Sequence, residues 1–337
     1  MLYQFAITPE VFEYASIKEM SPPGIVLEEL LRGICDNGLL ADIHAGQWLA
    51  AVRKNQLARE LPSELRDSIE SLLNVLYSRN RIIRYPLGSA KFQDDDYRWL
   101  RWSLERHNAD SLTGVFTTDA MIELSELQNT LLVRISKALS SNCWLGRKRS
   151  LSFTKVASNL QQHLAPIVRY ANKVSLIDPY MNCREDRFLN TVQHCANLLG
   201  RNDGKQNLGI IHIHAGDPLN TGLAEHRESS QDRLKRWSIA LRQMAQQWGH
   251  TFRVFLWGKQ KTSLGLGRVF HDRYIITDQV GISTPSGLDF LEDEDEHRAH
   301  QTTWTTLDVE IVRSILLVEF SKSKSPYLFL DSIEVRP

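Results

Sequence analysis

The sequence has little of what marks specialised classes of protein. Its 337 residues include four cysteines, Cys35, Cys143, Cys183 and Cys195, and no two of them form a Cys-x-x-Cys pair. That spacing does not suit a structural zinc site, and four cysteines in so long a chain do not make a disulfide framework. No window reaches the roughly 18–20 apolar residues of a membrane span, and the N-terminus has no basic segment before an apolar core. We therefore expect a reduced, cytoplasmic protein with no metal site and no membrane span.

Neither sign of charge is in excess, because 40 Lys and Arg residues balance 40 Asp and Glu residues. This balance excludes a protein that coats nucleic acid by bulk charge, whereas a local basic patch remains compatible with phosphate binding. The chain also has no Walker A sequence, and Gly265 and Gly267 lack the rest of a nucleotide-binding fingerprint. We expect no cofactor.

The length predicts two domains. Residues 1–145 are predicted to be mostly helical after one opening strand that ends near Pro9. Apolar residues recur there at helical spacing, as in Leu65, Ile69 and Leu72. A segment rich in serine, glycine and basic residues marks a boundary near residue 145. We interpret the first domain as a recognition or partner-docking domain.

Strands and helices alternate in residues 150–337. Apolar runs at 173–180, 208–214 and 251–257 predict strands, and amphipathic segments between them predict helices. Helices of this length between strands imply crossover connections and a largely parallel sheet. The predicted fold is therefore an α/β domain with a central mixed or parallel sheet, preceded by the mostly helical domain.

A fourth predicted strand carries a pattern with chemical meaning. It reads His271-Asp-Arg273-Tyr-Ile-Ile-Thr-Asp278, which is H-x-R-x4-D, and a glycine, Ser283 and Ser286 follow it. On a strand, His271 and Arg273 would leave the same face. An imidazole that attacks phosphorus, a cation that holds the phosphoryl oxygens and a carboxylate that orients a histidine suit phosphodiester chemistry.

This pattern resembles the hallmark of the phospholipase D superfamily, H-x-K-x4-D followed by glycine and serine. The resemblance covers roughly residues 153–337 and implies a phospholipase-D-like α/β sandwich. It also implies that His271 is a transiently phosphorylated nucleophile, that Arg273 takes the phosphate-binding lysine position and that Asp278 is the motif's aspartate. Arginine keeps the charge of lysine but differs from it in shape and hydrogen bonding.

The resemblance further implies a site with two histidines, one the nucleophile and one the general acid, yet the chain has one motif. Either two chains share a site in a homodimer, with His271 from each, or the protein is inactive. His214 is the best candidate in the chain for the second histidine. The enzyme alternative is a phosphodiesterase of the nuclease type, in a bacterial defence or toxin-like system.

Gly287-Leu288-Asp289, after the motif, makes this region similar to the C-terminal domain of MIT-domain proteins as well. That resemblance implies an inactive phospholipase-D-like module that binds a protein partner, nucleic acid or a phospholipid headgroup. A structural alternative pairs His271 and Arg273 with Asp178 or Asp289 in a buried ionic cluster. All three interpretations remain open at this stage.

Two further groups of residues are candidates for binding. Asp178 and Tyr180 close the first strand of the second domain, and the carboxyl ends of strands line the binding crevice in open α/β sheets. The alternative for them is a turn and helix cap. The segment 144–149 combines a tryptophan with three basic residues, which suits either nucleic-acid contact or a solvated linker. We expect a homodimer, or a partner protein bound through the N-terminal domain.

Overall fold

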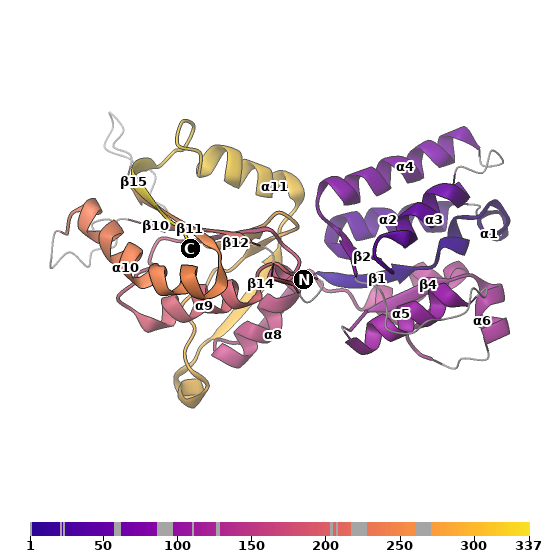
Figure 1. Cartoon of the computed structure of the whole chain (residues 1–337), viewed down its shortest axis with the longest axis horizontal. Coiled ribbons are helices and arrows are strands. Elements are labelled where there is room, and N and C mark those ends of the chain that lie inside the picture. Colours follow the sequence, from indigo (N-terminus) through magenta and orange to yellow (C-terminus); the bar gives the residue numbers. More distant parts are fainter. Residues whose placement is uncertain are drawn as a thin grey trace. The chain divides into compact units, whose positions relative to one another are not determined.

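A computed structural model describes the chain apart from residues 1, 21, 23, 57–61, 86–96, 110, 126–128, 203–204, 207, 217–227 and 260–270. The chain divides into two compact units, Leu2–Lys148 and Arg149–Pro337 (Figure 1). None of the described helices combines the length and the apolar character that a membrane crossing requires.

The N-terminal unit is an α/β structure built on a five-stranded, all-parallel sheet of order β3-β2-β1-β4-β5. The strands are β1 (Tyr3–Ile7), β2 (Gly38–Asp42), β3 (Ile82–Arg84), β4 (Gly114–Thr117) and β5 (Leu132–Arg134). The α-helices are α1 (Tyr14–Glu19), α2 (Ile25–Asn37), α3 (Gln47–Gln56), α4 (Ser63–Ser78), α5 (Arg98–Ala109), α6 (Asp119–Ser125) and α7 (Asn142–Leu145). Two 3-10 helices, η1 (Pro9–Phe12) and η2 (Ile135–Ser140), complete the unit. In Figure 1, α2, α3 and α4 lie on one side of the sheet and α5 and α6 on the other.

The prediction of a single opening strand in this unit was wrong, because four more strands follow β1. Every residue of β2 is buried, and β3 and β5 have only three residues each. Strands buried on both faces show no alternation of polar and apolar residues, so the sequence gives no strand signal there. The unit is therefore α/β, with long helices around a parallel sheet.

The C-terminal unit is also α/β, as predicted, and its eight-stranded sheet is mixed. The strand order is β15-β11-β10-β7-β12-β13-β14-β6. The strands are β6 (Ser150–Thr154), β7 (Lys173–Asp178), β10 (Ile210–Gly216), β11 (Thr251–Gly258), β12 (Tyr274–Thr277), β13 (Gly281–Ser283), β14 (Gln301–Thr306) and β15 (Leu328–Val335). In a separate two-stranded sheet, β8 (Arg201–Asn202) pairs antiparallel with β9 (Lys205–Gln206). Among the named strands of the eight-stranded sheet, β7 pairs with β10 and β10 pairs with β11 in parallel.

Helices cover both faces of this sheet (Figure 1). One face carries α8 (Ala157–Val168), α9 (Asp186–Leu198) and α10 (Ser230–Trp248). The other carries α11 (Val309–Ser314) and the π-helix η5 (Ile315–Glu319), which pack on a core that includes Ile177, Trp257 and Phe320. The 3-10 helix η4 (Asp293–Arg298) precedes β14.

The position of β7 determines which residues meet at one end of the central strands of the sheet. This strand is parallel to β10 and antiparallel to β12, with Ile177 opposite Tyr274. The carboxyl end of β7 therefore lies beside the start of β12. As expected from the sequence, the segments that contain Asp178 and Arg273 belong to one sheet.

Candidate functional site

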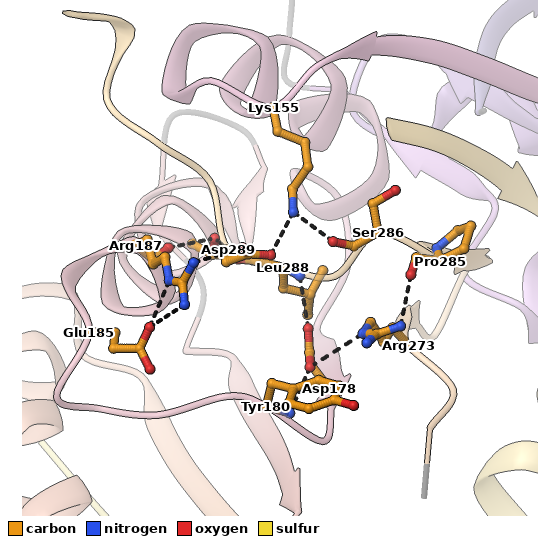
Figure 2. Close-up of polar contacts among 11 residues, drawn as sticks. Lys155, Asp178, Tyr180, Glu185, Arg187, Arg273, Pro285, Ser286, Leu288 and Asp289 are labelled. Atoms are coloured by element: carbon orange, nitrogen blue, oxygen red, sulfur yellow. Dashed lines mark hydrogen bonds and ion pairs between the residues drawn. The ribbon is translucent and has the colours of Figure 1, made fainter. Parts of the chain in front are cut away.

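Asp178 is the centre of a polar cluster at the carboxyl end of β7 (Figure 2). Its side chain is almost fully buried, and its oxygens accept hydrogen bonds from the backbone N–H groups of Tyr180 and Leu288, both at 2.9 Å. Burial raises the pKa of this carboxyl group, and the two N–H donors and Arg273 act against that rise. The cluster is therefore built around a buried acid whose hydrogen bonds favour its charged form.

Arg273 is a cation paired with this acid. Its Nε lies 3.7 Å from Asp178 Oδ1, and its Nη1 donates to the Pro285 carbonyl at 2.8 Å. The guanidinium carbon lies 4.9 Å from the centre of the Tyr180 ring, which is 37% exposed. These contacts fix the arginine, while 24% of its side chain remains open to solvent. An anion that approaches this edge would meet an oriented guanidinium group.

A loop of residues 284–289, named here the GLD loop, covers Asp178. Lys155 Nζ donates to the Ser286 carbonyl at 2.7 Å and to Asp289 Oδ1 at 2.5 Å. Arg187 Nη1 binds Asp289 Oδ2 at 3.2 Å and also pairs with Glu185. The loop is thus held by a lysine that directly follows β6 and an arginine of α9, as well as by Asp178 (Figure 2).

Gly287 is required by the geometry of this loop. Its φ is +85°, and a Cβ atom there would lie 2.9 Å from Asp289 Oδ1 and 3.1 Å from Asp178 Oδ2. Only glycine adopts this conformation readily and leaves room for both carboxylates. The Gly-Leu-Asp sequence therefore has a structural reason in this chain.

The motif residues do not share a strand face as predicted, because β12 begins at Tyr274 and both His271 and Arg273 precede it. The neighbouring strand β7 ends at Asp178, and Pro179 has no N–H group with which to continue the pairing. His271 is exposed at this edge. The structural alternative is met in part, since Arg273 pairs with Asp178.

Asp278 lies at the opposite end of β12 from Arg273. Its carboxylate accepts hydrogen bonds from the backbone N–H and side-chain amide of Asn172, each at 3.2 Å. Five residues of extended chain separate the two motif positions by roughly 16 Å. Asp278 therefore secures the start of β7 and does not orient a histidine beside Arg273.

His214 lies on the other face of the sheet. It is paired in register with Ile177, the residue before Asp178, and neighbouring residues of a strand face opposite ways. Its Nδ1 accepts a hydrogen bond from Trp257 Nε1 at 3.1 Å, and burial lowers its pKa well below the ordinary value. His214 is thus a neutral core histidine. It does not supply a second histidine at the place where the carboxyl end of β7 meets the start of β12, named here the Arg273 edge.

The two predicted serines differ in position. Ser283 is opposite Tyr274 on β13, so its side chain is on the face away from Arg273. Ser286 is exposed in the GLD loop, next to the carbonyl that Arg273 binds. The structure thus brings together Asp178, Tyr180, Arg273 and Ser286, and it separates Ser283 from them.

No pattern in the sequence indicated that Lys155 and Arg187 belong to the site. Lys155 is 7% exposed and lies 134 residues before its partner Asp289, so no local pattern links the two. The available signal was a lysine between a threonine and a valine at the junction of β6 and α8. Arg187 lies on the first turn of α9, where an acid is the more usual residue.

The basic segment near the boundary has a structural role. The Arg147 guanidinium carbon is 3.2 Å from the centre of the Trp144 ring, and Nη1 donates to Asn37 Oδ1 at 3.1 Å and to the Gly33 carbonyl. Arg147 therefore binds the end of α2 within the N-terminal unit. Gly265 and Gly267 lie outside the described residues.

Comparison with protein-family models and with curated proteins finds no match to this chain. Among the described residues, no three His, Cys, Asp or Glu side chains converge as metal ligands would.

Proposed function

We propose that the C-terminal unit is a phosphate-recognition module of phospholipase-D-like type that binds without turnover. The observation that carries this proposal is the pairing of Arg273 with buried Asp178, away from His214 and Asp278. Phosphodiester cleavage through a histidine needs a nucleophile and a general acid at one phosphorus atom. Binding needs only an oriented cation and hydrogen-bond donors.

The arrangement around Arg273 suits an anionic ligand. Tyr180 supports the guanidinium group from one side, and the Pro285 carbonyl fixes its orientation. Ser286, which follows Pro285 in the GLD loop, is exposed. A phosphate oxygen bound here would compete with Asp178 for the same guanidinium group.

A chromogenic phosphodiester, bis(p-nitrophenyl) phosphate, tests binding and turnover together. We expect saturable binding by calorimetry and no release of p-nitrophenolate. The double variant Asp178→Asn with Arg273→Gln should abolish binding and still fold, because it removes both charges of the pair and leaves neither uncompensated. Arg313→Gln on α11, whose exposed arginine pairs with Glu310, is the matched control and should bind normally.

A dimeric phosphodiesterase is the second candidate, and the exposure of His271 two residues from Arg273 favours it. In that case turnover should occur, rise with protein concentration through the dimerisation range and disappear in His271→Ala. Turnover of that kind would replace the binding-only proposal, and the absence of both turnover and binding would contradict both candidates.

A further inference from the structure

Three arginines gather at the end of β10, next to the Arg273 edge. Arg184 Nη2 lies 3.3 Å from Glu228 Oε2, and Arg236 pairs with the other oxygen of Glu228. Arg233, one turn before Arg236 on α10, donates from Nη2 to the Gly216 carbonyl at 2.8 Å. A loop and a helix that are far apart in the sequence thus direct three cations to one place.

In the part of the chain that the structure describes, Arg184 and Arg236 share a single carboxylate. Glu228 is one carboxylate between two of the guanidinium groups, and its side chain is only 18% exposed. Asp232, the next acid on α10, accepts a hydrogen bond from the Ser229 hydroxyl at the helix cap. Arg184 and Arg236 remain 54% and 37% exposed, so a ligand can reach them.

The arginine group is connected to the Arg273 edge through the backbone. Gly216, the last residue of β10, donates its N–H to the Pro179 carbonyl at 3.1 Å, and Pro179 follows Asp178. The strands β12, β7 and β10 are neighbours in the sheet. Two strand spacings, about 10 Å, therefore separate the start of β12, beside Arg273, from the end of β10, where Arg233 binds the Gly216 carbonyl.

We propose that Arg184, Arg233 and Arg236 form a second anion subsite, and that the ligand is a single-stranded phosphodiester chain whose phosphates reach both subsites. This inference rests on the proposed phosphate recognition at Arg273. A single phosphate occupies one subsite. A single-stranded phosphodiester chain spans the distance of about 10 Å and places a base near the exposed Tyr180 ring.

The test compares thymidine monophosphate with an oligothymidylate of about six nucleotides, a length within the usual range of single-strand sites. Affinities are measured by calorimetry on the full chain. We expect the oligonucleotide to bind about tenfold more tightly, since one additional charge-assisted contact is worth about that factor.

Variants assign this gain to the second subsite. Arg184→Gln with Arg236→Gln should remove the gain and leave monophosphate binding unchanged. Glu228→Gln removes the competing carboxylate and should strengthen oligonucleotide binding. Stronger binding would also show that the region folds without the Glu228 ion pairs. Arg242→Gln is the matched control, because Arg242 is exposed on α10 but lies on another side of the helix.

The outcomes separate the two proposals. Monophosphate binding without a length-dependent gain, or a gain that survives in the Arg184 and Arg236 double variant, would overturn the second subsite and leave the proposed function intact. If a soluble bisphosphorylated lipid headgroup competed for the site as well as the oligothymidylate does, the assignment of the ligand as a single-stranded phosphodiester chain would be overturned. No binding of either nucleotide would contradict phosphate recognition itself.

Discussion

His214 shows how burial changes the chemistry of a single residue. It stacks on Phe255 at a ring distance of 4.8 Å and lies 5.1 Å from Phe320, with its Nε2 buried and without a hydrogen-bond partner among the described residues. His212, two residues earlier, has its pKa lowered to about 3 by burial and by nearby cations. Both imidazoles are therefore neutral in the folded protein at pH 7.

This neutrality predicts acid sensitivity. Unfolded histidine takes up a proton near pH 6.5, whereas these folded histidines do so only at much lower pH, so the unfolded state binds more protons in between. The free energy of unfolding should therefore have its full value above about pH 6.5 and should fall as the pH drops below that. His214 alone should contribute a slope of up to about 1.4 kcal/mol per pH unit. Urea titrations at several pH values measure this slope.

The matched variants for this prediction are His214→Gln and His297→Gln. The first keeps an acceptor for Trp257 Nε1 and removes a titrating group, so the slope should decrease. His297 is exposed, so its replacement should leave the slope unchanged. An unchanged slope in His214→Gln would contradict the assignment of the acid sensitivity to buried, neutral His214.

The GLD loop is the element on which the candidate site depends. Gly287→Ala would place a methyl group against both Asp178 and Asp289 at a positive φ. We expect a loss of about 1–3 kcal/mol in the free energy of unfolding and weaker phosphate binding, because the carboxylate of the Arg273 pair must shift. Denaturant titration and calorimetry measure the two effects.

Gly249→Ala is the control for backbone strain alone. Gly249 ends α10 at φ +71°, and a Cβ atom there would meet only the Leu208 side chain, at 3.1 Å. It should lower stability without any change in binding. Equal effects of the two substitutions on binding would show that Gly287 has no special relation to the site.

The elements that the sequence predicted well are those whose signal is local. The apolar stripe Leu234, Trp237 and Leu241 is buried on α10, and the strand that ends at Asp178 was recognised from its apolar run. Short strands without alternation, such as β2, were not recognisable. The start of β12 also escaped prediction, because it depends on where β7 ends and not on the residues of β12 itself.

The site was predictable only in part for the same reason. The carboxyl-end rule selected Asp178, and the motif selected Arg273. The contributions of Lys155 and Arg187 depend on contacts across more than 100 residues of chain. The motif also suggested a role for Asp278 that its position at the far end of β12 does not support.

The charge balance of the whole molecule limits how it can attract a polyanion. With 40 basic and 40 acidic residues, the chain has no excess of charge to steer nucleic acid from a distance. Two phosphate contacts on a single strand predict a slope of about −1.4 for the logarithm of the binding constant against the logarithm of the salt concentration. A salt series with the oligothymidylate measures it, and a slope steeper than about −4 would indicate a far larger interface than the two subsites.

The edges of the eight-stranded sheet have a practical consequence. The first strand of the C-terminal unit, β6, and its last strand, β15, occupy opposite edges. Seven interstrand gaps amount to roughly 33 Å, more than a linker of a few residues can bridge. A circular permutant that joins these ends would need a long connection. For the same reason, a reporter fused after Pro337 would start a sheet's width from β6.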